Sequence, residues 1–280
     1  MNPNLTIMPV RGVDLAVWDW PGSGPPFLFA HATGFHARCW DEVIRALTGR
    51  RAVAVDLRGH GRSTKTEPPY CWREFGNDIA GLARLLDLRD AVGVGHSMGG
   101  HSIAMAAALR PQVFSSLLLV DPTIFAREHY GTPRRHDASY IGKRRNDWAS
   151  PKEMFDRFHD RPPFANWRVE VLRDYCEYGL LPQGNRYVLA CPPEIEASIY
   201  ASSNAAEADI YPLLENIQAP VTVVRGGIPW NTEKFDLAAS PTAPDLASRF
   251  RRGRDICLEG RSHYIPMESP ELVAQYLAEG

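Results

Sequence analysis

One serine of the chain stands in a context that can make it a nucleophile. A short apolar run, residues 91–94, leads into Gly95-His96-Ser97-Met98-Gly99, and a helical pattern follows over residues 102–109. A G-x-S-x-G sequence between a strand and a helix is typical of a sharp turn that exposes the serine hydroxyl. The glycines allow this turn. The amide of Met98, at the start of the helix, is then expected to point toward an oxyanion formed at Ser97.

A serine hydroxyl is a poor nucleophile at neutral pH and needs an adjacent base, for which histidine is well suited. The best candidate is His263, because it lies in a loop that follows the last predicted strand, residues 255–258. From such a loop a side chain can reach back over the sheet. We expect two other histidines, His31 and His60, to organise turns through hydrogen bonds instead.

The third member of a catalytic triad is a carboxylate that orients the imidazole. The loop after the predicted strand 221–225 holds no acid before Glu233 and Asp236, whereas Asp121 ends the strand that follows the serine helix. A carboxylate on that neighbouring strand can also reach a histidine above the nucleophile. We therefore favour Asp121, with Asp236 and then Glu233 as alternatives. The competing interpretation is that Asp121 only caps the turn at Pro122.

An oxyanion hole needs two amides that point inward. Met98 is expected to supply one of them. The other is expected from the loop after the predicted strand 27–30, with Thr33 favoured over Ala32 and Gly34. The hydroxyl of Thr33 is a further possible donor.

These candidates require a sheet that brings distant residues together. Apolar runs of four to six residues alternate with helical patterns, which indicates an α/β fold whose mostly parallel strands are buried on both faces. Ligand sites in such sheets lie at the carboxyl ends of the strands. Four polar residues fall at predicted ends of this kind: His31, Asp56, Ser97 and Asp121.

The pattern changes between residue 123 and about residue 219. This segment has no clear strand and reads as several short helices with many aromatic residues. We interpret residues 123–218 as a helical cap inserted after the strand ending at Asp121, and residues 1–122 and 219–280 as the core domain. Most cap aromatics are expected to pack on the core. For the substrate pocket we predict Phe35 and His36 as lining residues and His96 as a wall residue.

Composition narrows the functional classes. The formal net charge is −2, so no global attraction to nucleic acid or to an anionic membrane is expected. Scattered histidines and five widely spaced cysteines, without a C-x-x-C pair, suggest neither a metal site nor a disulfide framework. The sequence implies no cofactor. No apolar run is long enough to span a bilayer, and the first residues show no secretory signal, so we expect a cytoplasmic protein. The oligomeric state is left open.

Taken together, these motifs resemble those of the α/β-hydrolase superfamily, over nearly all of the chain outside 123–218. The resemblance rests on four segments in order, namely residues 31–35 followed by Trp40, residues 56–63, the Ser97 turn and the His263 loop. It implies an oxyanion amide at Thr33, although Ala32 stands where the family commonly has glycine. Family members usually carry the acid after the later strand. Some, including a subgroup of haloalkane dehalogenases, carry it after the earlier one, and a lid inserted there is also a family trait.

The superfamily contains many activities, so the fold alone does not fix the chemistry. Serine at the nucleophile position argues against epoxide hydrolases and dehalogenases, for which the resemblance implies aspartate. The prediction is a carboxylesterase that cleaves small-molecule esters through an acyl-enzyme intermediate. Two alternatives are a C–C bond hydrolase acting on ring-cleavage diketones and a noncatalytic ligand-binding member of the fold.

Overall fold

The computed structural model describes residues 2–132, 140–230 and 236–279. Within these ranges a central sheet contains eight strands in the spatial order β1-β2-β4-β3-β5-β6-β9-β10. The strands are β1 (Asn4–Val10), β2 (Val13–Trp20), β3 (Ser23–Ala30), β4 (Arg50–Asp56), β5 (Ala91–His96), β6 (Phe114–Val120), β9 (Val221–Gly226) and β10 (Gly253–Leu258). β1 and β2 form an antiparallel hairpin, and β2 is antiparallel to β4. The remaining pairs are parallel. This confirms the predicted α/β-hydrolase fold with a mostly parallel sheet.

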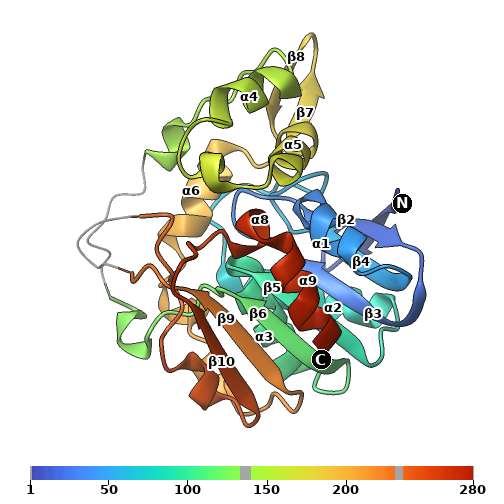
Figure 1. Cartoon of the computed structure of the whole chain (residues 1–280), viewed down its shortest axis with the longest axis vertical. Coiled ribbons are helices and arrows are strands. Elements are labelled where there is room, and N and C mark those ends of the chain that lie inside the picture. Colours follow the sequence, from blue (N-terminus) through green and yellow to red (C-terminus); the bar gives the residue numbers. More distant parts are fainter. Residues whose placement is uncertain (1, 133–139, 231–235, 280) are drawn as a thin grey trace.

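Helices cover both faces of the sheet (Figure 1). They are α1 (Asp41–Ala46), α2 (Trp72–Leu85), α3 (Met98–Leu109), α7 (Tyr211–Leu214), α8 (Ile265–Glu268) and α9 (Pro270–Glu279). Alternation along β3 shows how the strands serve two cores. Phe27 and Phe29 pack with α1 and α9, whereas Leu28 and Ala30 pack with α2 and α3. Side chains of a strand alternate between faces, so an unbroken apolar run is buried on both sides, as the sequence predicts.

The segment between β6 and β9 rises above the carboxyl ends of the strands (Figure 1). Its described elements are α4 (Pro151–Phe158), α5 (Val169–Tyr178), β7 (Leu180–Gln183), β8 (Arg186–Leu189) and α6 (Pro193–Ala201), together with short 3-10 turns, before α7 returns the chain to the core. The expectation that this segment lacks strands is wrong, because β7 and β8 form an antiparallel hairpin. Gly184, with φ +63°, lies in the turn between them.

A cluster of apolar and aromatic side chains joins this segment to the core. Trp167 and Tyr175 from the inserted segment pack at tilted angles around Phe35, with ring centroids 5.7 and 5.2 Å away. Tyr264, which follows His263, lies 5.3 Å from the Trp167 ring. Most other cap aromatics pack in or against the same cluster, as predicted, and Trp167 and Tyr175 contact the loop that follows β3.

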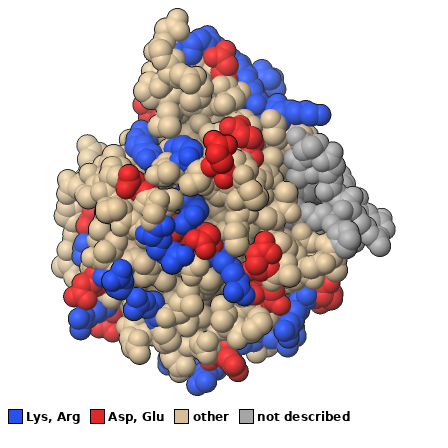
Figure 2. Space-filling view, turned by 180° about the vertical axis from the view of Figure 1, so that it is seen from behind, with Lys and Arg blue, Asp and Glu red and all other residues tan. Residues whose placement is uncertain are grey.

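Charged side chains of both signs are interspersed on the face seen from behind (Figure 2). At one edge of the sheet, Arg225 of β9 and Asp255 of β10 form an ion pair at 2.9 Å. Among the described residues, no helix is both long and apolar enough to cross a membrane.

Candidate active site

The turn between β5 and α3 places Ser97 in a strained backbone conformation. Ser97 has φ 56° and ψ −119°, in a region that residues with a side chain rarely occupy. Close packing explains the second glycine of the motif. A Cβ on Gly99 would lie 2.1 Å from the carbonyl oxygen of Ala30, so only glycine lets α3 begin this close to β3. The turn therefore holds the Ser97 side chain at the carboxyl end of β5.

Ser97, His263 and Asp121 form one continuous chain of hydrogen bonds. His263 Nε2 lies 3.0 Å from Ser97 Oγ, and His263 Nδ1 lies 2.7 Å from Asp121 Oδ2. All three side chains are largely buried. This geometry permits a proton to move from Ser97 to His263 while a carboxylate faces the other ring nitrogen.

Asp121 is held in place by several donors besides His263. Its Oδ1 accepts hydrogen bonds from the amide of Gly226 at 3.0 Å and from the hydroxyls of Ser240 at 2.5 Å and Thr242 at 3.1 Å. Its own backbone has φ 44°, an unusual conformation for a residue other than glycine. With His263, four donor groups surround this fully buried carboxylate, although the Thr242 hydroxyl shares its one proton with the carbonyl of Pro122 at 2.8 Å. Both carboxylate oxygens therefore act as acceptors.

Asp236, one of the two alternative acids, does not share this position. Asp236 is exposed, and its carboxylate accepts a hydrogen bond from the amide of Ala238 at 2.9 Å. The link from that loop to His263 is through the main chain, because the amide of His263 donates to the carbonyl of Ala238 at 2.8 Å. Glu233 lies outside the described residues.

The two predicted oxyanion donors are neighbours. The hydroxyl of Thr33 lies 3.4 Å from the sulfur of Met98, and both residues are buried. In the described part of the chain, neither backbone amide donates to a protein acceptor. Buried amides are nearly always paired, so two unengaged ones next to Ser97 are available to a ligand oxygen.

Histidines organise the loop that carries Thr33, as the sequence predicts. The amide of Gly34 donates to His60 Nε2 at 3.1 Å, and the amide of Leu57 donates to His31 Nε2 at 2.9 Å. Each ring donates from Nδ1 to a backbone carbonyl, which fixes its neutral tautomer. Burial lowers the pKa of His31 to about 3 and that of His60 well below its usual value. These two rings therefore act as uncharged struts.

His96 and His36 are also neutral and buried. The ring of His96 lies 4.9 Å from that of His263, and its Nε2 donates to the His263 carbonyl at 2.9 Å. Burial, followed by the nearby His263, holds the pKa of His96 well below its usual value. Burial lowers the pKa of His36 to about 4. Neither ring adds charge beside His263 near neutral pH.

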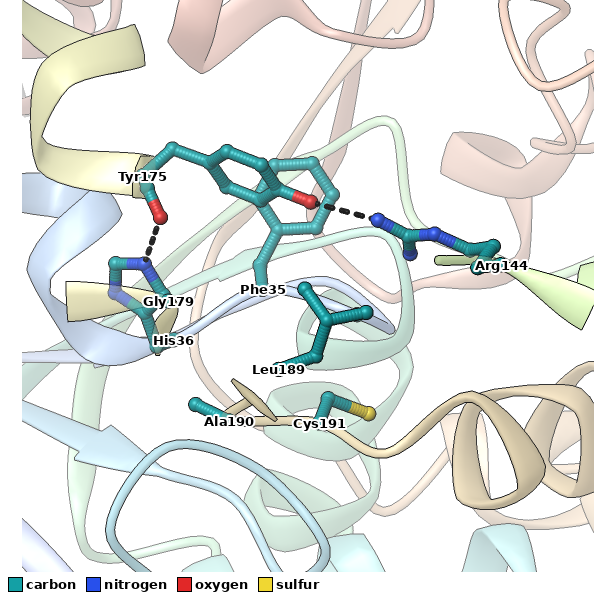
Figure 3. A pocket seen from close by; sticks show the side chains of 9 residues that line it. Phe35, His36, Arg144, Tyr175, Gly179, Leu189, Ala190 and Cys191 are labelled. Atoms are coloured by element: carbon teal, nitrogen blue, oxygen red, sulfur yellow. Dashed lines mark hydrogen bonds between the residues drawn. The ribbon is translucent and has the colours of Figure 1, made fainter. Parts of the chain in front are cut away.

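A small cavity lies between the inserted segment and the loop after β3 (Figure 3). Its lining residues include the predicted Phe35 and His36, together with Arg144 and Tyr175, whose hydroxyl accepts a hydrogen bond from the guanidinium at 3.2 Å. The cavity volume is about 10 Å³, which is close to the space of one water molecule.

Arg144, which is half-buried, also forms an ion pair with the buried Glu196 of α6. The Glu196 carboxylate packs against the backbone of Gly34, where a Cβ would lie 2.6 Å from Oε1. Burial raises the pKa of Glu196, and the hydrogen-bonded guanidinium opposes this shift. The inserted segment thus contacts the loop that carries Thr33 through a charged pair.

Several residues of the site were not found from the sequence. Thr123, whose hydroxyl lies 3.0 Å from Ser97 Oγ, follows Asp121 by two positions, and this proximity was the available signal. No local sequence signal pointed to Ser240 or Thr242, because they reach Asp121 from a loop that is distant in the sequence. Among the described residues, no group of three or more His, Cys, Asp or Glu side chains is arranged to hold a metal ion.

A mostly parallel sheet with a serine turn after its fifth strand, joined to a histidine and a carboxylate from later loops, defines the class of α/β hydrolases. A family model described as "Alpha/beta hydrolase family" matches residues 27–276, and the chain belongs to that family. The family and the relatives below support a hydrolytic enzyme.

Two curated relatives align with most of the chain. The 2-(acetamidomethylene)succinate hydrolase of Mesorhizobium japonicum is 28% identical over 264 residues, which cover 90% of this chain and 86% of the relative. An esterase of Mycobacterium tuberculosis is 38% identical over 239 residues, which cover 74% of this chain and 68% of the relative.

Two solved structures share the fold. The structure of E-2-(acetamidomethylene)succinate hydrolase superposes with a TM-score of 0.76 at 24% identity, covering 99% of this chain and 98% of the other. N-formylmaleamic acid deformylase from Pseudomonas putida superposes with a TM-score of 0.72 at 21% identity, covering 99% and 100% of the two chains.

Proposed function

We propose that the chain is a serine carboxylesterase that cleaves small-molecule esters through an acyl-enzyme intermediate. The observation that carries the proposal is the hydrogen-bonded chain from Ser97 Oγ through His263 to Asp121. In this proposal Ser97 is the nucleophile, His263 the general base and acid, and Asp121 the carboxylate that orients the imidazole. The M. tuberculosis esterase among the relatives also supports it.

The mechanism follows from the hydrogen-bond directions. His263 carries its proton on Nδ1, facing Asp121, so Nε2 is free to accept the proton of Ser97. Ser97 Oγ attacks the ester carbonyl, and the oxyanion is stabilised by the amides of Thr33 and Met98. His263 then protonates the leaving alcohol. Water, activated by His263, cleaves the acyl-enzyme and releases the acid.

The strained Ser97 backbone supports the same assignment. A left-handed conformation at a buried serine costs about 1–3 kcal/mol and persists only where the surrounding structure enforces it. Here it directs the hydroxyl toward His263 and lets the amide of Met98 face the same space. A serine with only a structural role would have no need of either.

The first test is hydrolysis of p-nitrophenyl acetate, butyrate and octanoate by wild type and by Ser97→Ala. We expect turnover by wild type and loss of nearly all of it in Ser97→Ala, about 10⁵- to 10⁶-fold in kcat. A fluorophosphonate probe, which reacts with activated serines, is expected to label wild type and not the variant. Ser102→Ala is a matched control, because this buried serine of α3 donates to the Met98 carbonyl and does not contact His263.

The same panel separates the alternatives. The similarity to a 2-(acetamidomethylene)succinate hydrolase and to an N-formylmaleamic acid deformylase makes it worthwhile to add substrates other than simple esters. Turnover of a ring-cleavage diketone without ester turnover would favour the C–C hydrolase. Absence of turnover and of probe labelling in wild type would contradict the esterase and favour a noncatalytic binding protein.

A further inference from the structure

A second hydroxyl contacts the oxygen that we propose as the nucleophile. Thr123 Oγ1 lies 3.0 Å from Ser97 Oγ, and the amide of Thr123 donates to the Ser97 carbonyl at 3.0 Å. Thr123 is 7% exposed, so the contact is almost free of bulk water. Ser97 Oγ therefore has two hydrogen-bond partners within the protein, His263 and Thr123.

The position of Thr123 is fixed from both sides. On one side, the hydroxyl of Thr242 donates to the carbonyl of Pro122 at 2.8 Å. On the other side, the amide of Ala243 donates to the carbonyl of Ile124 at 2.9 Å. The loop after β9 thus holds the residues before and after Thr123, so its side chain is directed at Ser97 by the fold.

The direction of the Thr123 hydrogen bond follows from counting protons. Asp121 accepts on both oxygens, so the proton between it and His263 sits on Nδ1. His263 Nε2 is then an acceptor and takes the single proton of Ser97. With that proton committed, Ser97 Oγ can only accept from Thr123, and Thr123 is the donor.

We propose that Thr123 is a further catalytic residue, whose hydroxyl stabilises the negative charge that develops on Ser97 Oγ as the bond between this oxygen and the acyl carbon breaks. The inference rests on the proposed acyl-enzyme mechanism. In deacylation, water adds to the acyl carbon and gives a proton to His263 Nε2. The carbon–Oγ bond then breaks, its electron pair stays on Oγ, and His263 returns the proton to Oγ. Thr123 keeps its own proton throughout.

The contribution is expected to differ between the two half-reactions. In the free enzyme, Ser97 Oγ is an alcohol oxygen and accepts well from Thr123, so this hydrogen bond already stabilises the state before acylation. In the acyl-enzyme the same atom is an ester oxygen, whose lone pair is delocalised into the carbonyl and accepts poorly. The hydrogen bond therefore strengthens more during deacylation, and only such differential stabilisation accelerates a step.

The test compares Thr123→Val, which removes the hydroxyl at similar volume, with Thr123→Ser, which keeps it. Rapid-mixing kinetics of p-nitrophenyl acetate separate acylation, seen as the burst of p-nitrophenol, from deacylation, seen as the steady rate. We expect Thr123→Val to slow deacylation about 10- to 100-fold and acylation by less than about tenfold. Acyl-enzyme then accumulates, and the burst amplitude approaches the concentration of probe-reactive sites. Thr123→Ser is expected to restore the wild-type ratio of the two rate constants.

Controls keep the inference separate from the proposed function. Thr123→Ala removes the hydroxyl without adding a methyl group in its place. It must change the ratio of the acylation and deacylation rate constants as Thr123→Val does, so that a packing defect in one variant does not decide the result. Equal slowing of both steps, or of neither, in an enzyme that is still labelled by the fluorophosphonate would overturn the role of Thr123 and leave the esterase proposal intact. A wild type that shows neither ester turnover nor labelling would overturn both.

Discussion

Replacing Asp121 by asparagine probes the proposed triad while nearly preserving shape. The new amide has one oxygen and one NH2 group, and the surroundings decide which faces His263. On the Oδ1 side there are three donors, the amide of Gly226 and the hydroxyls of Ser240 and Thr242, whereas His263 is the single partner on the other side. Facing NH2 toward three donors would lose three hydrogen bonds, so the NH2 group is expected to face His263.

This orientation reverses the tautomer of His263. An NH2 group facing Nδ1 requires that nitrogen to be an acceptor, so the ring proton moves to Nε2. His263 then donates toward Ser97 Oγ and is unable to take its proton. The loss expected from a wrong tautomer is about 10⁴-fold in kcat, which corresponds to about 5.5 kcal/mol of transition-state stabilisation.

The assay is p-nitrophenyl butyrate hydrolysis by wild type, Asp121→Asn and Asp236→Asn, with thermal unfolding to verify that each variant is folded. Asp236 is exposed and does not contact His263, so Asp236→Asn is the matched control and is expected to stay within about twofold of wild type. The reasoning is refuted if Asp121→Asn is folded and keeps more than about a tenth of wild-type kcat. Collapse of Asp236→Asn instead would reassign the acid.

Three further predictions concern the surroundings of the site. Gly34→Ala places a Cβ on a residue with φ +80°, in contact with Glu196 Oε1. We expect the free energy of unfolding to fall by about 1–3 kcal/mol and kcat to fall as well. Denaturant titration and ester turnover measure these two changes. His60→Phe leaves the Gly34 amide without its acceptor; we expect a fall in kcat of about tenfold with a smaller change in KM, and an unchanged kcat would contradict the role of His60 as a strut. Burial, followed by the carboxylate of Asp41, raises the pKa of Asp174 to about 7. Between about pH 4 and 7 the folded protein therefore binds a proton at Asp174 more tightly than the unfolded chain does. The free energy of unfolding consequently falls as the pH rises through this range. Asp174→Asn should therefore be more stable than wild type by about 1–2 kcal/mol at pH 8, after allowance for partial exposure, and equal to it near pH 4; thermal unfolding at both pH values checks this, and a gain at pH 4 alone would contradict the sign.

The parts of the fold that the sequence predicts are those set by local pattern. Apolar runs of buried strands and the glycines around Ser97 are short-range signals. They were sufficient for the parallel sheet and the serine turn. Asp56 was likewise expected at a strand end, and there it accepts from the amides of Ala37 and Arg62 at 2.8 and 2.9 Å. Its role is therefore to hold two loops beside the site.

The cap was harder to predict because its elements are short. β7 and β8 have four residues each, and β7 contains Pro182, which is disfavoured within strands. The hairpin is stabilised by contacts beyond its own pairing, since the backbone of Tyr187 in β8 exchanges two hydrogen bonds with that of Trp148, a residue far away in the sequence. Strand propensity within such a segment is too weak to reveal pairing that depends on tertiary contacts.

The position of Asp121 changes what the loop after β9 has to do. Where the catalytic acid of an α/β hydrolase lies on the loop after β9, that loop supplies the carboxylate of the triad. Here the hydroxyl of Ser240 donates to a carboxylate that directly follows β6, and the hydroxyl of Thr242 shares its one proton between that carboxylate at 3.1 Å and the carbonyl of Pro122 at 2.8 Å. The same hydrogen bonds therefore orient Asp121 toward His263 and direct Thr123 at Ser97. It follows that removing the Thr242 hydroxyl, as in Thr242→Val, should disturb both at once. The loss of kcat should be larger than in Ser240→Ala, which removes a donor to Asp121 and a long contact with the Thr242 amide but leaves the Thr242 hydroxyl in place. Comparison of the two variants in the ester assay checks this coupling, and an equal or smaller loss in Thr242→Val would show that the two roles are independent.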